Sequence, residues 1–322
     1  MNEFNLYWPV YKNLEKEFLQ LADYIHFSDD QTNVYSMHIA DLIVRCSIEI
    51  EAISKELYLN LGGNLSPVDA IGNKRDLYFD TDCIDLLEKQ WKLGNKQIIV
   101  SAATFYFSAD TNKILTPLHK ANKRGSSGSK WKQAYQSVKH SRKSSLKIAS
   151  IENLLHAMGA LYILNLYYKD VNFNIGRVYM GTNEFDNRVG SEVFSVFTYK
   201  ATLLSMSSCM DDSCIMKQKD NDLDSSIYII KYDNESFIKM HESYCKNSEI
   251  TIINFNNSPE VDKFLKENPD YKIESINKTC MDAGGMDLLR RILSFNHENS
   301  KDTKAEAMIN KHVGIYPTVE NY

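Results

Sequence analysis

The sequence predicts an α-helical bundle in the N-terminal half, followed by an α+β domain in the C-terminal half. Apolar residues recur at helical spacing up to about residue 170, and segments rich in Val, Ile, Tyr, Phe and Thr follow. The 322 residues suit about two domains, at roughly 100–200 residues each. We therefore expect a helical domain at 1–170, an α+β domain of unknown role at 171–296, and a polar tail or arm at 297–322.

The helical half is expected to contain five helices. Their apolar residues recur every three or four positions, and the last helix is apolar on most sides, as is typical of a helix in the middle of a bundle. The predicted ranges are Tyr11–Ile25, Met37–Tyr58, Thr81–Leu93, Ser129–Ser141 and Ile148–Tyr168. The segment Ile98–Phe107 suits either a strand or a buried helix, and both assignments stay open.

The C-terminal half is expected to mix strands with short helices. Strands are predicted at Glu192–Leu203, Ser226–Tyr232 and Glu249–Phe255, with Tyr271–Ile276 as a further candidate. Helices are predicted at Pro259–Glu267 and Gly285–Phe295. This mixture predicts an α+β domain rather than a continuation of the bundle.

The composition is that of a folded globular protein. With 43% hydrophobic and 25% charged residues, the chain can bury a sizeable core, which excludes disorder over its whole length. Its 6 Cys are too few for a disulfide scaffold. The polar N-terminus lacks the features of a signal peptide, and there is no run of about 18 apolar residues. We therefore expect a soluble, cytoplasmic protein with no membrane partner.

The positive charge is concentrated in one window of an acidic chain. The formal net charge is −5, yet the window from Thr111 to Ile151 holds ten Lys and Arg residues and no Asp or Glu. A sharply basic segment of this kind is a candidate anion site. A solvated basic face that is balanced by acids elsewhere in the fold accounts for the same count, so both interpretations stay open.

The segment 131–142 holds the residues best suited to chemistry on an anion. His140 can give or take a proton near neutral pH, while Lys139 and Arg142 can hold a phosphate and stabilise charge that develops on it. These groups can cut RNA without a metal, by attack of the 2′-hydroxyl on the adjacent phosphate. The alternative is an ordinary basic cluster at a helix end. Further candidate RNA- and phosphate-binding residues are Lys123, Arg124, Lys130, Lys132 and Lys143.

A ladder of charges gives a second tier of candidates. Asp41, Arg45 and Glu49 are spaced four residues apart, which places them on one face of the helix predicted at Met37–Tyr58. This face either lies opposite the His140 segment or forms a solvated stripe.

Other motifs carry weaker signals. Cys209 and Cys214 have the spacing of a metal pair, but no second Cys/His pair at zinc-finger spacing accompanies them, so no metal site is expected. The segment 125–130 has a phosphate-loop composition without the G-x4-G-K-[ST] register. His156 lies on an apolar helix and is expected in the core. No cofactor motif is present.

The basic segment resembles the end of a HEPN-like helical domain, and the resemblance covers residues 1–170 only. The residues that carry it are Trp131, Tyr135-Gln136-x-Val138-Lys139-His140-x-Arg142, Ala149, Leu154 and Ala160-Leu161-Tyr162, with Ile50-Glu51-Ala52-Ile53-Ser54-Lys55 fitting the start of such a domain. Many HEPN proteins are ribonucleases of toxin–antitoxin and antiphage systems, and they usually dimerise to bring two Arg-x4–6-His motifs together. Here the basic residues flank His140 as Lys139 and Arg142 instead.

The resemblance implies a metal-independent ribonuclease effector of a bacterial antiphage or toxin-type system. His140 would be its acid/base, and Lys139 and Arg142 would bind the phosphate of an RNA substrate. It also implies a homodimer, with the C-terminal half as a sensor of a trigger or of a partner protein. The missing Arg-x4–6-His spacing supports a second expectation, a non-catalytic subunit of a defence complex that binds nucleic acid or a partner protein.

Overall fold

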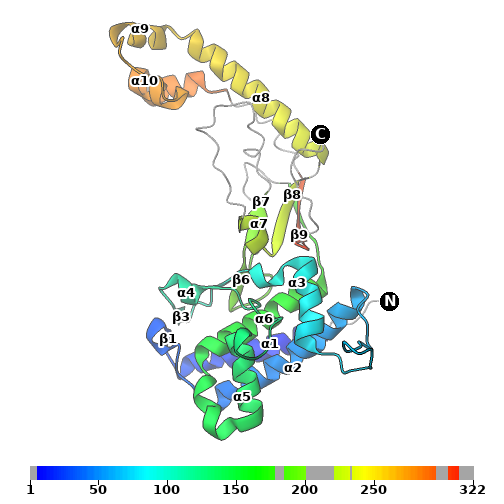
Figure 1. Ribbon diagram of the computed structural model, residues 1–322. Helices are drawn as coiled ribbons and strands as arrows, with labels where there is room; N and C mark the ends of the chain where they lie inside the picture. Colours follow the sequence, from blue (N-terminus) through cyan, green and yellow to red (C-terminus); the bar gives the residue numbers. More distant parts are fainter. Residues whose placement is uncertain (1–5, 178–184, 201–220, 233, 295–303, 312–322) are drawn as a thin grey trace. The chain divides into compact units, whose positions relative to one another are not determined.

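The computed structural model describes residues 6–177, 185–200, 221–232, 234–294 and 304–311, and it combines helices with small sheets (Figure 1). The chain divides into two compact units. Unit 1 comprises the described residues within 1–173, 185–231 and 307–322, and unit 2 those within 174–184 and 232–306. The boundary expected near residue 170 lies at the end of the first segment of unit 1, and two later segments also group with this unit.

Four helices form the body of unit 1. They are α1 (Tyr7–Gln20), α2 (Met37–Asn60), α5 (Lys130–Ser145) and α6 (Ile151–Lys169). Helix α6 packs against the other three, and its side chains are buried on almost every side (Figure 1). This confirms the expectation of an apolar helix in the middle of the helical half.

Serine caps fix the starts of the two longest helices of unit 1. The Oγ atom of Ser36 accepts a hydrogen bond from the backbone N–H of Ile39 at 3.1 Å, where α2 begins. Ser150 caps α6 in the same way by accepting from the N–H of Asn153. Both caps satisfy backbone donors that have no partner within the helix.

Unit 1 also contains short strands. Strands β1 (Phe27–Ser28) and β3 (Phe105–Tyr106) pair in parallel, while β2 (Ile98–Val100) pairs in antiparallel with β4 (Ile114–Leu115) and with β6 (Phe194–Val196). The segment Ile98–Phe107, which the sequence leaves open, therefore contains two short strands. A Cβ atom at Gly159 of α6 would lie 2.6 Å from the end of the Ile98 side chain and 2.8 Å from the Pro117 ring, so a larger residue at this position would displace one of them.

Short helical segments connect the longer elements of unit 1. The π-helical turn η3 (Phe79–Ile84) leads into α3 (Asp85–Trp91), which together correspond to the helix predicted at Thr81–Leu93. Helix α4 (Asp110–Lys113) precedes β4. The 3₁₀ turns are η1 (Leu21–Asp23), η2 (Asp29–Gln31), η4 (Leu93–Asn95), η5 (Gly125–Ser127) and η6 (Leu146–Ile148).

A four-stranded sheet has the order β5-β9-β8-β7. Its strands are β5 (Phe173–Arg177), β9 (Lys304–Ile309), β8 (Tyr228–Tyr232) and β7 (Thr198–Lys200), and α7 (Asn221–Ser225) precedes β8. Strands β7 and β8 run parallel. Part of the expected tail thus forms β9, in which Ala305, Ala307 and Ile309 alternate with more exposed residues.

Unit 2 contains α8 (Asn234–Asn256), α9 (Pro259–Glu267) and α10 (Ile276–Ile292). Its apolar core is formed by Phe255, Val261, Cys280, Leu288 and Ile292. The helix predicted at Pro259–Glu267 is confirmed. Helix α10 begins earlier than predicted and is interrupted at Gly285, whose φ of 69° lies in the region that favours glycine.

Two strands predicted in this region are wrong. The segment 249–255 belongs to α8, where Thr251 and Asn254 lie on one helical face. Thr251 Oγ1 accepts from the N–H of Ser294, just after α10, and Asn254 donates to the carbonyl of Ile292, the last residue of α10. This packing overrides the β propensity of the neighbouring isoleucines. The segment 271–275 has no regular structure; its first residue, Tyr271, packs its ring on Phe264 and donates a hydrogen bond to Asp282.

Candidate anion-binding site

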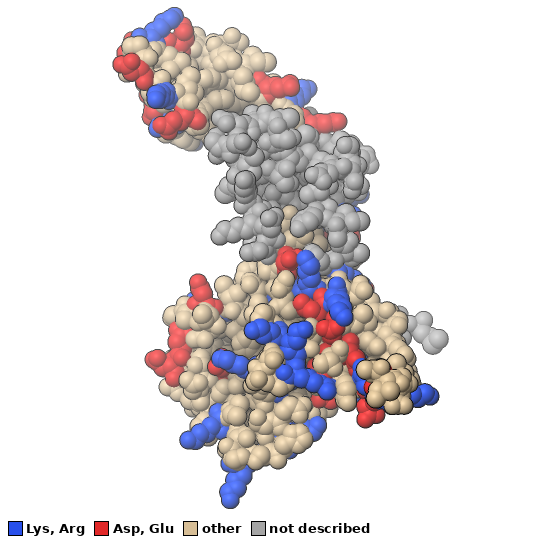
Figure 2. All heavy atoms as spheres, viewed as in Figure 1, with Lys and Arg blue, Asp and Glu red and all other residues tan. Residues whose placement is uncertain are grey.

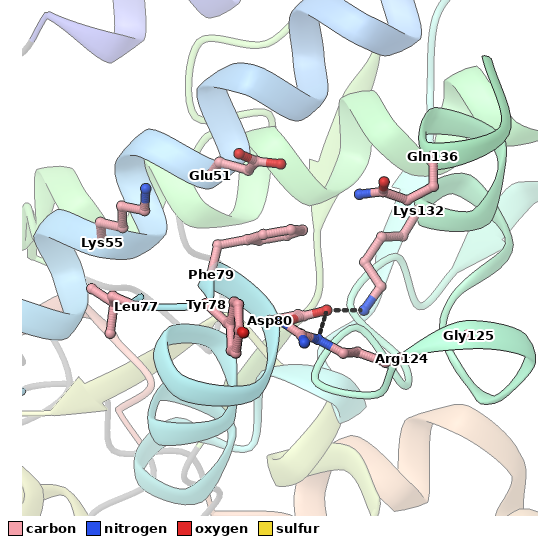
Figure 3. A pocket seen from close by; sticks show the side chains of 10 residues that line it. All are labelled: Glu51, Lys55, Leu77, Tyr78, Phe79, Asp80, Arg124, Gly125, Lys132 and Gln136. Carbon is pink, nitrogen blue, oxygen red and sulfur yellow. Dashed lines mark hydrogen bonds and ion pairs between the residues drawn. The ribbon is translucent and has the colours of Figure 1, made fainter. Parts of the chain in front are cut away.

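A pocket of about 440 Å³ opens at the surface of unit 1, between α2, η3, α5 and the loop before α5 (Figure 3). Two of the predicted phosphate-binding residues, Arg124 and Lys132, belong to it. The full lining is Glu51, Lys55, Leu77, Tyr78, Phe79, Asp80, Arg124, Gly125, Lys132 and Gln136.

Asp80 is buried in the wall of this pocket and accepts hydrogen bonds from two cations (Figure 3). The Nε atom of Arg124 lies 3.0 Å from its Oδ1, and the Nζ atom of Lys132 lies 3.2 Å from its Oδ2. Burial raises the pKa of Asp80, but the backbone N–H of Thr81 and the two cations outweigh this effect and hold the pKa below its usual value. The carboxylate is therefore ionised at neutral pH.

Lys132 acts as a buried cross-link within the pocket wall. Besides Asp80, its ammonium group donates to the backbone carbonyls of Ala121, at 2.9 Å, and Lys123. Burial lowers the pKa of Lys132, and the charge of Asp80 opposes that shift. Because a lysine has only three N–H donors, Lys132 has none left for a ligand and instead ties the loop before α5 to η3.

Arg124 differs from Lys132 because its outer nitrogens remain available. Its guanidinium group stacks on Tyr78, with the central carbon 3.7 Å from the ring centroid. Only its Nε donates a hydrogen bond within the described part of the chain, and 48% of the side chain is exposed. The Nη1 and Nη2 groups can therefore bind an anion that enters the pocket.

Asp82 fixes the segment that carries Tyr78, one of the residues lining the pocket. Its Oδ2 accepts the backbone N–H of Tyr78 at 2.9 Å, and its two oxygens accept from Arg75 at 2.6 and 2.7 Å. The hydrogen bond from Arg75 lowers the pKa of Asp82. Since the π-helical turn begins at Phe79, the Arg75–Asp82 pair fixes the chain on both sides of Tyr78.

The opposite side of the pocket comes from two helices. Glu51 and Lys55 project from α2, and Gln136 projects from α5, with the Phe79 ring between them (Figure 3). Burial raises the pKa of Tyr135, and the nearby charge of Glu51 raises it further. No hydrogen bond joins Lys55 or Gln136 to another described side chain, so both groups are free to bind a ligand.

The residues with the strongest sequence signal lie just beyond the pocket, at the exposed end of α5. Lys139, His140, Arg142 and Lys143 are all exposed, and the helix is interrupted at Ser141 immediately after His140. Within the described residues, no hydrogen bond or ion pair involves the side chains of His140, Arg142 or Lys143. The Nζ atom of Lys139 lies 5.4 Å from the Tyr135 ring centroid.

The pocket and this exposed end share one face of α5. Gln136 and His140 are separated by one helical turn, which corresponds to about 6 Å along the helix axis. On the face drawn in Figure 2, Lys and Arg side chains gather near acidic ones in the middle of unit 1, and others stand singly along the edge where Figure 1 places α5.

Two other predicted phosphate-binding residues, Lys123 and Lys130, lie outside the pocket. Lys130 pairs with Glu152 at 3.2 Å, and the side chain of Lys123 is exposed. These two residues flank η5 and do not line the pocket. The basic window is therefore partly a set of structural ion pairs and partly an exposed cationic surface.

The charge ladder on α2 does not face the α5 motif. Arg45 donates two hydrogen bonds to Glu17 of α1, at 2.6 and 2.8 Å, and lies 4.0 Å from Asp41. The hydrogen bond to Glu17 raises the pKa of Arg45. Glu49 is half-buried and is not part of the pocket lining. Arg45 therefore joins α1 to α2.

Sequence reasoning missed Tyr78, Asp80 and Glu51 as site residues. The acid-free basic window requires carboxylates from elsewhere in the fold, but nothing in the sequence shows that Asp80 supplies one of them. His156, for which the sequence predicts a place in the core, is half-buried on α6, and burial lowers its pKa.

The described residues contain neither a metal-binding cluster nor a membrane-spanning helix. There, no group of three or more His, Cys, Asp or Glu side chains is arranged to hold a metal ion, and no helix has the length and apolar character needed to cross a membrane. Cys209 and Cys214 lie outside this part of the chain. Comparisons with protein-family models, with curated proteins and with solved structures found no match to this chain.

Proposed function

We propose that unit 1 is a HEPN-like helical domain that binds RNA, and that the exposed end of α5 contacts the RNA phosphates. The observation that carries this proposal is the joint exposure of Lys139, His140, Arg142 and Lys143. Among the described residues, no carboxylate pairs with His140, Arg142 or Lys143, so these groups need not break an ion pair to meet a phosphate. Release of counterions from RNA then favours binding.

The same residues supply the chemistry for cutting that RNA. His140 takes the proton from a ribose 2′-hydroxyl, and the oxygen forms a bond to the adjacent phosphorus. Lys139 and Arg142 stabilise the charge that develops on the phosphorane. The bond from phosphorus to the next 5′ oxygen then breaks, and that oxygen accepts a proton. The products carry a 2′,3′-cyclic phosphate and a 5′-hydroxyl.

Completing the reaction requires a second proton-transfer group. In a homodimer that is closed by two-fold symmetry, the partner's His140 supplies it. In this proposal the protein is a cytoplasmic ribonuclease effector of a bacterial antiphage or toxin-type system. Unit 2 has its own apolar core, which supports a separate role in sensing a trigger or a partner protein.

Salt-dependent binding tests the RNA contact. Fluorescence anisotropy with a labelled single-stranded RNA would compare the wild type with Lys139→Gln/Arg142→Gln. The slope of log K against log salt should fall by about 1.4 in the variant, at roughly 0.7 for each phosphate that the variant no longer neutralises. Lys16→Gln, an exposed lysine on α1, is the matched control and should leave the slope unchanged. Equal slopes in all three proteins would overturn RNA binding at this surface.

A non-catalytic RNA-binding subunit is the second candidate function. It is favoured by the surroundings of His140, because no described side chain hydrogen-bonds the imidazole and fixes its orientation, as an acid/base histidine commonly requires. This candidate shares the salt dependence described above, but it gives no product with a 2′,3′-cyclic phosphate end.

A further inference from the structure

The pocket beside α5 offers ligand-binding groups that the proposed chemistry at His140 does not use. Its volume of about 440 Å³ lies in the range of small-molecule sites, roughly 300–1,000 Å³. It combines an aromatic ring, Phe79, with polar groups from three elements, namely Arg124, Glu51 and Gln136 (Figure 3). An aromatic face beside a cation and amide-like polar groups is suited to a nucleotide.

Arg124 can bind the phosphate of such a ligand. Asp80 is already neutralised by the Nε atom of Arg124 and by Lys132, so the Nη groups of Arg124 carry positive charge that the pocket does not compensate. The planar Nη pair suits two phosphate oxygens. Because Tyr78 and Asp80 already hold the guanidinium in place, little side-chain freedom is lost on binding. Lys55 is also exposed, but it lies on the α2 side of the pocket, opposite Arg124 (Figure 3).

The opposite end of the pocket can bind a base. Figure 3 shows the Phe79 ring near the Glu51 carboxylate, with the Gln136 amide directed toward them from α5. A base that stacks on Phe79 therefore meets Glu51 and Gln136 with its hydrogen-bonding edge. RNA-binding proteins commonly read unstacked bases by this combination of aromatic stacking and side-chain hydrogen bonds.

The chemistry of Glu51 and Gln136 selects among the bases. An ionised carboxylate only accepts hydrogen bonds, while an amide both donates and accepts. On its Watson–Crick edge, guanine places two N–H donors side by side, next to the O6 acceptor. Adenine, cytosine and uracil place a lone-pair acceptor beside each donor, and this acceptor would face the carboxylate. We propose that the pocket binds a guanosine monophosphate unit, with guanine on Glu51 and Gln136 and the phosphate on Arg124.

This unit has two chemical sources, a free nucleotide or one guanosine of a bound RNA. The RNA source rests on the proposed function, because it uses the single helical turn between Gln136 and His140 to place the bound guanosine near the reacting phosphate. The free nucleotide requires nothing of His140. The recognition chemistry is the same in both cases.

Calorimetric titration of the full chain with GMP, AMP, CMP and UMP tests the pocket. GMP should bind at least about tenfold more tightly than the other three, since a good pair of base contacts discriminates by roughly tenfold or more. Glu51→Gln should remove most of this preference. Its control is Glu56→Gln, also on α2 but outside the lining. Gln136→Ala should weaken GMP binding, and Ser137→Ala on the same helix should not.

Competition distinguishes the two sources. If GMP displaces an oligouridylate that contains one guanosine, and the all-uridine strand binds more weakly, the pocket reads RNA. If GMP binds and leaves RNA affinity unchanged, the ligand is the free nucleotide. Equal affinity for all four nucleotides would overturn the proposal. So would a lack of binding by GMP together with equal binding of the two oligonucleotides. Neither result alters the predicted effect of Lys139 and Arg142 on salt dependence, so the proposed function is judged separately.

Discussion

Replacing Lys132 with methionine should destabilise unit 1 by about 3 kcal/mol. The ammonium group is buried and donates to Asp80 and to the carbonyls of Ala121 and Lys123. Methionine has a similar volume but no donor, so Asp80 keeps only one cation and two carbonyl groups lose their partner. Removal of one member of a buried pair costs roughly 3–5 kcal/mol. Because Arg124 still bonds Asp80, we expect the lower end of that range.

Urea unfolding measures this change. Trp131 precedes Lys132 in the sequence. Its indole is buried and donates a hydrogen bond to the Pro117 carbonyl at 2.8 Å, so its fluorescence should report the loss of structure around α5. Lys130→Met is the matched control on the same helix. Its salt bridge to Glu152 involves an exposed lysine, and its loss should cost less than about 1 kcal/mol.

A double variant separates the charge pair from packing. If the penalty arises from an incompletely neutralised Asp80, then Asp80→Asn in the Lys132→Met background should recover about 1 kcal/mol. A Lys132→Met variant that is as stable as the Lys130→Met control would rule out a large contribution of the Lys132 ammonium to stability. A double variant that loses the full sum of the two single penalties would also refute it.

Three further predictions concern Glu15, Lys96 and the pH dependence of Asp80. Glu15→Ala should cost about 3 kcal/mol, because its carboxylate accepts from Tyr11, Ser191 and the N–H groups of residues 192 and 193; thermal unfolding and amide exchange at 192–193 would show the loss, and unchanged exchange would contradict it. Burial lowers the pKa of Lys96 to about 7, so between that pH and the unfolded value near 10.4 only the unfolded chain holds the proton and stability should rise with pH; Lys96→Met should flatten this rise, and an equally steep rise in the variant would exclude Lys96 as its source. The pKa of Asp80 is lowered in the folded state. Its ionised form therefore stabilises the fold above the unfolded pKa near 3.9, and this stability is lost as pH falls through the folded pKa. Asp80→Asn should reduce the loss of stability in acid, and the same acid dependence in the variant would count against this.

The long elements of unit 1 could be predicted because local pattern and burial agree there. Helices α2 and α6 have long apolar periodicities and serine caps at their starts. The strand predicted at 249–255 is wrong, because a run of β-branched residues does not show which part of the chain the segment packs against. There, Thr251 and Asn254 hydrogen-bond the end of α10 and the residues just after it, and this contact stabilises a helix.

The candidate site could be predicted only in part. The basic window and the residues around His140 are contiguous, so spacing and charge point to them directly. The pocket depends on Asp80, Arg124 and Gln136, which come from three separate segments and meet only through the packing of α2, η3 and α5. Charge alone also cannot distinguish Lys132, whose three donors all bind protein acceptors, from an exposed cation such as Arg142.

In the proposed function, the exposed end of α5 cuts RNA through His140. The most direct measurement is a denaturing-gel assay of total RNA and tRNA with the wild type, His140→Ala and the control His119→Ala, which alters another exposed histidine of the basic window. We expect EDTA-resistant cleavage by the wild type and by His119→Ala, with 2′,3′-cyclic phosphate ends, and none by folded His140→Ala. Cleavage by His140→Ala at the wild-type rate, or no cleavage by the wild type while it binds RNA, would overturn the proposed ribonuclease.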